Sequence, residues 1–283
     1  DLGSSAPVPL ADLPRFEADP RFTVLRQDYA YSGAQHQIFF NLDTPVLKDR
    51  RVREAVAHAL DLNKIVETVF YGAAKVSPSP ISVALGPYYD TTIKPRAFDT
   101  ARSEKLLEEA GLAKKGDGMR VQLRLLINPF IDTRLAEFVR QSLRRVGIDA
   151  VIQPREFAAY VKQVYTDREF DLIIESLSNV FDPTVGVQRG YWSKNFKPGL
   201  PFSNSAHYES AEADRLLEAA AVETDPAKRK ALWKDFQQLI YKDIPSVDMI
   251  SPLEVVIAKK NLRNFATGAE GISSNWADAY FAN

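Results

Sequence analysis

The segment from about residue 119 to residue 177 most constrains the fold, because its apolar residues alternate between strand and helix patterns. It predicts a strand over 119–127, a helix from Asp132 or Thr133 to Gly147, a strand over 148–153, a helix around 155–166 and a strand over 170–177. Strands joined by helices run parallel, with right-handed crossovers. The segment therefore predicts an α/β unit with a partly parallel sheet.

Two polar residues follow strands of this predicted sheet. Asn128 comes after the first strand, and Asp182 comes shortly after the third, directly before Pro183. Parallel strands share one carboxyl-end edge, which is where open α/β sheets contact their ligands. We interpret both residues as candidate ligand contacts. The alternative is that Asp182 caps a turn, as Asp before Pro often does, and that Asn128 is only a turn residue.

Further elements are predicted on both sides of this unit. The sequence predicts a strand over residues 37–42 and a long loop, rich in aromatic residues, Gly, Ser and Asn, over residues 186–208. Loops of that length are often functional. Tyr191 and Trp192 in this loop would line a cleft or, equally well, pack in the core. Helices that begin at a capping aspartate are predicted over 49–60, 61–72, 99–111 and 225–243, and a further helix is predicted over about 209–222.

The composition excludes several classes of function. The formal net charge is −1, so no overall field attracts nucleic acid or an anionic membrane. Cysteine is absent, which excludes disulfides, thiol nucleophiles and thiolate metal sites. The three histidines, His36, His58 and His207, do not have metal-ligand spacing. No phosphate-binding loop or catalytic constellation is present, so we expect no metal, no cofactor and no catalysis.

Short strings along the whole chain carry a resemblance to one family. In chain order they are Phe39-Phe-Asn41, residues 47–66, Phe70-Tyr-Gly72, Phe98-Asp99, residues 106–111, residues 143–148, Phe170-Asp-Leu172, Asp182-Pro183, residues 225–232 and Asp243-Ile-Pro245. Their order and spacing resemble those of the extracytoplasmic solute-binding proteins of peptide, nickel and related ABC importers (peptide/nickel-binding family 5).

The resemblance implies a periplasmic-binding-protein-like (type II) fold, in which two lobes close on a solute. Residues 44–248 would form a nearly whole second lobe, an α/β unit with a mixed, partly parallel sheet flanked by helices. Residues 1–43 and 249–283 would be fragments of a first lobe whose larger, N-terminal part is missing from this chain. The strands near 38–43 and 246–251 would be the hinge.

The resemblance also implies roles for single residues. In peptide-binding members the acid matching Asp182 pairs with the α-ammonium group of the ligand. Dipeptide binders often carry an arginine in the loop matching 128–133, but this loop has no basic residue, which argues against a free dipeptide. Asn41 would lie where the chain crosses between lobes. The predicted ligand-binding residues are Asp182, Asn128, Asn41, Tyr191 and Trp192.

The implied function is capture of a peptide or related small solute and its delivery to an ABC transporter permease, in the periplasm or another extracytoplasmic space. An alternative is a ligand-sensing domain of a cytoplasmic transcriptional regulator, because related lobes occur behind DNA-binding modules. Sequence upstream of this chain would distinguish the two. A third class, an α/β enzyme, is disfavoured by the lack of a nucleophile or metal constellation.

Overall fold

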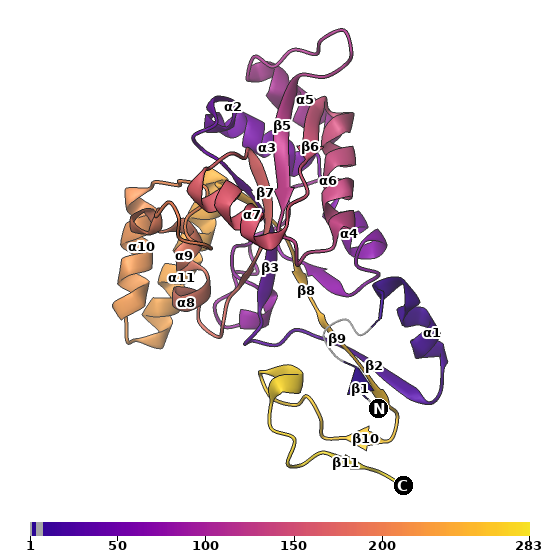
Figure 1. Cartoon of the computed structure of the whole chain (residues 1–283). Helices are drawn as coiled ribbons and strands as arrows, with labels where there is room; N and C mark the ends of the chain where they lie inside the picture. Colours follow the sequence, from indigo (N-terminus) through magenta and orange to yellow (C-terminus); the bar gives the residue numbers. More distant parts are fainter. Residues whose placement is uncertain (1, 4–7) are drawn as a thin grey trace.

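The computed structural model describes residues 2–3 and 8–283 of the chain. Its larger part, here called the body, is built on a six-stranded sheet with strand order β4-β8-β3-β7-β5-β6 (Figure 1). The strands are β3 (Ala34–Phe40), β4 (Ala74–Val76), β5 (Val121–Ile127), β6 (Ile148–Ile152), β7 (Leu172–Ser178) and β8 (Ser246–Pro252). β5 pairs in parallel with both β6 and β7, which confirms the predicted β-α-β-α-β unit. β3 pairs antiparallel with β7 and β8, so the sheet is mixed.

Helices cover both faces of this sheet and bury two hydrophobic clusters. One cluster lies under α3, α4, α5 and α6, and the other under α7, α10 and α11. The helices are α2 (Pro45–Lys48), α3 (Arg50–His58), α4 (Leu62–Thr68), α5 (Thr100–Glu109), α6 (Thr133–Arg145), α7 (Phe157–Val161), α10 (Ala211–Val222) and α11 (Pro226–Asp243). A π-helical turn, Lys162–Thr166, continues α7, and a 3-10 turn, Val83–Leu85, lies in the loop after β4.

The predicted helix caps are confirmed. The side chains of Asp49, Asp61, Asp99, Asp132 and Asp225 each accept a hydrogen bond from a backbone N–H in the first turn of the helix that follows. Each carboxylate satisfies a donor that the helix itself leaves unpaired. No helix in the described part of the chain is both long enough and apolar enough to cross a membrane.

The prediction of one long loop over 186–208 is wrong in its first part. α8 (Pro183–Gly186), α9 (Gln188–Tyr191) and a 3-10 turn, Ser193–Asn195, occupy this region, and only the stretch from Phe196 to Ser210 is irregular. Helices of a single turn are too short to show an apolar period in the sequence, which is why the pattern did not reveal them.

A smaller part, here called the extension, projects from the body (Figure 1). It contains a three-stranded antiparallel sheet of order β1-β9-β2, formed by β1 (Leu2–Gly3), β2 (Phe22–Gln27) and β9 (Glu254–Lys259). It also holds a 3-10 turn (Leu10–Asp12), α1 (Leu13–Ala18), β10 (Leu262–Arg263), a 3-10 turn (Gly271–Ser273) and β11 (Tyr280–Phe281). β10 pairs with β11.

The chain passes between body and extension twice, between Gln27 and Ala34 and between Pro252 and Glu254. These crossings differ from the ones expected near 38–43 and 246–251. β3 and β8 lie wholly inside the six-stranded sheet, and the chain leaves it at their other ends. An apolar strand pattern shows that a strand is buried but not which of its ends leaves the sheet. The division of the chain into two lobes stays a prediction.

Gly186 allows α8 to pack directly against the backbone that follows β7. A Cβ at this position would come closer than 3.0 Å to the Asn179 Cα and to the Ser178 carbonyl oxygen. Backbone atoms cannot move aside as a flexible side chain can, so we predict that Gly186→Ala lowers the free energy of unfolding by about 3 kcal/mol. Denaturant titration measures this. Gly116→Ala is the control, because its Cβ would meet no atom within 4 Å. Equal stability of the two variants would contradict the prediction.

Candidate functional site

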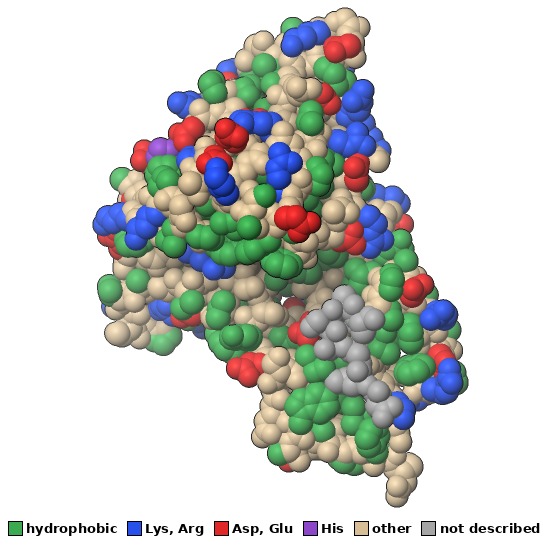
Figure 2. All heavy atoms as spheres, in the orientation of Figure 1, with side chains coloured by type: hydrophobic (Ala, Val, Ile, Leu, Met, Phe, Trp, Pro, Cys, Tyr) green, Lys and Arg blue, Asp and Glu red, His purple; other side chains and the backbone are tan. Residues whose placement is uncertain are grey.

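Of two adjoining hollows, the larger opens between the body and the extension, and the smaller is lined by body residues alone. The larger has a volume of about 680 Å³ and the smaller about 310 Å³, and His36, Phe130 and Ile131 line both of them. We call the combined space the cleft. Figure 2 shows that the surface is hollowed between the two parts and that hydrophobic side chains border it on the body side. The remaining body residues that line the cleft are Ser32, Ala34, Phe70, Ala73, Asn128, Asp132, Arg134, Ser176, Ser178, Arg189, Phe202 and Pro252, and the extension side contributes residues 8–10 and 253–255.

An open strand edge borders the smaller hollow. β5 pairs with β7 only from Leu172 to Ile174, whereas β3 pairs with β7 along its whole length. The carbonyl of Ile174 faces the β5 side, because it accepts from the N–H of Asn128 at 2.9 Å. Backbone groups alternate along a strand, so the N–H and C=O of Ser176 and Ser178 point to the same side, where β5 has ended. The Ser176 N–H is bonded there to the Glu175 side chain, and the Ser178 carbonyl lies against Gly186 of α8. The groups left open at this edge are the Ser176 carbonyl and the Ser178 N–H.

A buried carboxyl group fixes the start of this edge. Glu175 is 1% exposed, and it accepts hydrogen bonds from the side chain of Asn128, the N–H of Ser176 and the hydroxyls of Tyr160 (2.8 Å) and Tyr165 (3.0 Å). Burial raises the pKa of Glu175, although these four donors act to lower it. Because its acceptor capacity is taken up, Glu175 positions its neighbours and is not available to a ligand.

An aromatic cluster forms one wall of the cleft. Phe130 follows β5 and is 80% exposed, and its ring centroid lies 5.2 Å from that of Phe157. Phe157 in turn lies 6.3 Å from Phe202, and Phe202 lies 5.9 Å from Tyr165. An exposed aromatic ring beside polar strand atoms is typical of sites that bind solutes with mixed polar and apolar surfaces.

His36 stands where the two hollows meet. Its side chain is buried, and its Nδ1 atom has no hydrogen-bond partner among the described residues. Burial lowers the pKa of His36 to about 4, so the imidazole is uncharged at neutral pH. The described residues contain no group of three or more His, Asp or Glu side chains that could hold a metal ion.

A family model described as bacterial extracellular solute-binding proteins, family 5 middle, matches residues 1–199, which is well over half of the chain. The chain belongs to this family. The family consists of solute-binding transport proteins and is not a family of enzymes.

Relatives and solved structures agree with this assignment. A putative ABC transporter peptide-binding protein of Brucella ovis is 28% identical over 258 residues, which cover 90% of this chain and 47% of the relative. The Bacillus subtilis oligopeptide-binding protein AppA, solved with a nonapeptide, aligns with a TM-score of 0.80 at 24% identity over 98% of this chain and 55% of that one. NikA of Brucella suis, solved with Fe(III)-EDTA, aligns with a TM-score of 0.83 at 24% identity over 100% of this chain and 57% of that one. The chain thus spans about half the length of these proteins, and the solved structures establish the periplasmic-binding-protein-like fold.

Asp182 does not line the cleft. It caps α8 by accepting from the N–H of Thr184 at 2.8 Å, and both of its oxygens accept from Arg229 of α11 at 2.7 Å. Burial acts to raise the pKa of Asp182, but Arg229 and Thr184 outweigh it, so the pKa is lowered. This geometry supports the alternative that Asp182 caps a turn. Its role as a ligand contact stays a prediction.

The other four predicted residues are not gathered into one site. Asn128 lines the cleft, but its side chain already donates to Glu175 and accepts from the N–H of Phe130. Asn41 lies at the opposite end of β3 and bonds to the backbone of Arg168 and Phe170. Tyr191 is buried in the core against Phe39 and Phe236, and the Trp192 indole donates to Glu218. Tyr191 therefore packs in the core, which is the alternative that the sequence left open.

Several cleft residues were not anticipated from the sequence. No sequence pattern around His36, Arg189 or Phe202 indicates a role in binding. Ser176 and Ser178 do belong to such a pattern, because they alternate with the apolar Leu177 at the end of the strand. Alternation of this kind indicates a strand with one side facing solvent.

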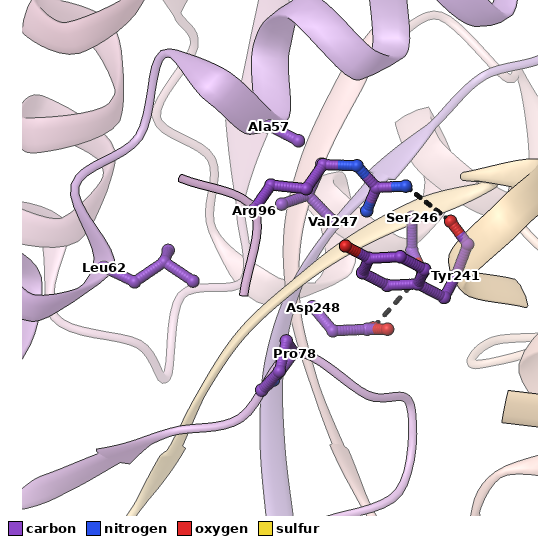
Figure 3. Close-up of a pocket in the computed structure, with 8 residues that line it drawn as sticks. All are labelled: Ala57, Leu62, Pro78, Arg96, Tyr241, Ser246, Val247 and Asp248. Carbon is purple, nitrogen blue, oxygen red and sulfur yellow. Dashed lines mark hydrogen bonds between the residues drawn. The ribbon is translucent and has the colours of Figure 1, made fainter. Parts of the chain in front are cut away.

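A small pocket elsewhere in the body is too small for a solute. It measures about 20 Å³, which is room for one water molecule, and it lies beside Asp248 (Figure 3). Asp248 accepts a hydrogen bond from Gln37. It also accepts one from Ser246, and Arg96 donates to the carbonyl of Tyr241 (Figure 3). None of the residues that line this pocket also lines the cleft.

Removal of the Asp182 carboxylate tests its structural role. Asp182→Ala would leave the partly buried Arg229 without its bidentate partner and α8 without its cap, so we predict a loss of about 2 kcal/mol in the free energy of unfolding. Glu212→Ala removes an exposed partner of Arg215 and should change stability little. Unfolding titrations of both variants make the comparison. If Asp182→Ala were as stable as the control and bound solute less tightly, the ligand role would hold instead.

The buried carboxyl group of Asp248 predicts a pH-dependent stability. Burial raises its pKa to about 6 from the usual 3.8, against the opposing effect of its hydrogen bonds. The folded state therefore favours the protonated form. Its stabilising contribution is complete below about pH 4 and is lost as the pH rises through 6, a difference of roughly 3 kcal/mol.

Asp248→Asn cannot ionise, and it keeps an acceptor for Gln37. We predict that the stability of this variant relative to the unaltered protein increases between pH 4 and pH 8. Unfolding titrations at the two pH values measure the change, and all other titrating groups cancel in the comparison. A relative stability that is the same at both pH values would refute this assignment.

Proposed function

We propose that this chain is the solute-binding component of an ABC importer and that it captures a small solute, a peptide or a related amine-bearing compound, in the cleft for delivery to the permease. The observation that carries the proposal is the open edge of β7 inside the cleft. An extended peptide backbone can add to such an edge as a further strand, with main-chain hydrogen bonds to the Ser176 carbonyl and the Ser178 N–H.

The surroundings of the edge suit a peptide. The exposed ring of Phe130 and its neighbours offer apolar contact to side chains, and the serine hydroxyls offer polar contact. The relatives support the same class, since one is named a putative peptide-binding protein and another was solved with a nonapeptide. Non-peptide solutes occur as well, as NikA with Fe(III)-EDTA shows for that protein.

The relatives are about twice as long as this chain, which supports a second lobe that closes over the cleft. In this proposal residues 44–248, together with β3 and β8, form one lobe, and the remaining parts of 1–43 and 249–283 belong to the other. The two crossings near 28–33 and 252–254 act as the hinge. Binding involves no catalytic step, and the protein works in the periplasm or another extracytoplasmic space.

The binding test uses the full-length protein and the peptide Ala-Phe-Ala by titration calorimetry. We expect saturable binding, with a smaller radius of gyration by small-angle scattering once the peptide is bound. Ser178→Pro removes the N–H that points to the open edge and should weaken binding about tenfold, which corresponds to the loss of one hydrogen bond.

Ser178→Ala is the matched control, because it keeps that N–H and should bind like the unaltered protein. Melting temperatures verify that both variants are folded. Absence of binding by a set of peptides of three to nine residues would overturn the peptide class, and equal affinity of the two Ser178 variants would overturn the role of the edge.

A further inference from the structure

Arg189 lies in α9 on the wall of the smaller hollow, close to the open edge of β7. Its Nε donates to the Gly186 carbonyl at 3.2 Å, which fixes the direction of the side chain. Its two terminal amino groups have no hydrogen-bond partner among the residues that the structure describes. The other arginine of the cleft, Arg134, is already engaged, because it forms a 2.6 Å ion pair with Asp132.

The environment of Arg189 is unfavourable for a cation that lacks a partner. Burial lowers the pKa of Arg189, and the acidic groups of Tyr165 and Glu175 only partly oppose this effect. Glu175 makes no hydrogen bond to Arg189, since its oxygens accept from Asn128, Ser176, Tyr160 and Tyr165. A partly buried guanidinium without a bonded anion costs free energy, and a bound anion would recover it.

The other residues that line the smaller hollow offer hydrogen-bond donors to a ligand, and none of them carries a negative charge that would pair with Arg189. The hydroxyls of Ser176 and Ser178 line it, and neither is engaged in a hydrogen bond among the described residues. His36 is uncharged at neutral pH, and its Nδ1 also lacks a partner. Phe202 flanks the guanidinium, with 5.9 Å between the Arg189 Cζ and the ring centroid. Arg189 is therefore the one cation that the described lining leaves open to a ligand.

We propose that Arg189 binds a carboxylate of the solute through its two terminal amino groups, so that the cleft selects acidic solutes over neutral ones. The planar fork of a guanidinium matches the two oxygens of a carboxylate. This inference rests on the proposed function, and it adds the chemical class of the solute. The carboxylate would be either the C-terminus of a peptide or an acidic side chain.

Titration calorimetry on the full-length protein separates these two sources with four probes: Ala-Glu-Ala and Ala-Gln-Ala, each as the free acid and as the C-terminal amide. If the C-terminus is bound, both free acids bind roughly 10- to 100-fold more tightly than their amides. If the side chain is bound, the glutamate peptides exceed the glutamine peptides by that factor. Equal affinities of all four probes would overturn the proposal.

Arg189→Gln should abolish this preference, so that all four probes bind with similar affinity. Arg189→Lys keeps the charge but loses the fork, and it should retain part of the preference. Arg140→Gln, an exposed arginine of α6 paired with Glu137, is the control and should behave like the unaltered protein. A merely structural role of Arg189 would weaken all four probes equally, and that result would also overturn the proposal.

One outcome separates this inference from the proposed function. If no peptide binds, the peptide class fails, and glutarate, a dicarboxylate without a peptide bond, becomes the probe for Arg189. Binding of glutarate that Arg189→Gln abolishes would support the carboxylate site without peptides. Absence of glutarate binding in that case would overturn it.

Discussion

β7 is paired with β3 along all of its seven residues but with β5 only from Leu172 to Ile174. The rest of the cleft depends on this difference. Antiparallel pairing with β3 holds the second half of β7 in an extended form, while the early end of β5 leaves its other side without a strand. The backbone is therefore rigid and still has hydrogen-bonding groups to offer, which is what recognition by strand addition requires.

Buried polar contacts keep this arrangement in place. Glu175, at the point where β5 ends, gathers four donors and thereby fixes the loop after β5, Tyr160 of α7 and Tyr165 of the π-helical turn. Gly186 lets α8 approach the end of β7, and the bidentate pair of Asp182 with Arg229 ties α8 to α11. Together these contacts set the position of α9, from which Arg189 faces the cleft. Asp182 thus contributes to the cleft indirectly, through the helix that it caps.

Much of the fold could be predicted from the sequence because it depends on local rules. The apolar periods placed the strands and helices around residues 119–177, and the capping aspartates marked where the helices begin. The site was less predictable. Asp182 and Asn128 follow strands as predicted, but Arg229 is 47 residues from Asp182 in the chain, and no local pattern shows that the two meet. Arg189 and His36 stand out only in the folded structure, where their side chains keep polar groups without hydrogen-bond partners among the described residues. No local sequence pattern shows this.

The central claim is that a peptide pairs with the open edge of β7, and hydrogen exchange of the Ser178 amide tests it most directly. This amide points away from β3, so it should exchange quickly in the protein without solute. The account predicts that saturating Ala-Phe-Ala slows its exchange strongly, while the amide of Leu177, which faces β3, changes little. An exchange rate at Ser178 that the bound peptide leaves unchanged would contradict the account.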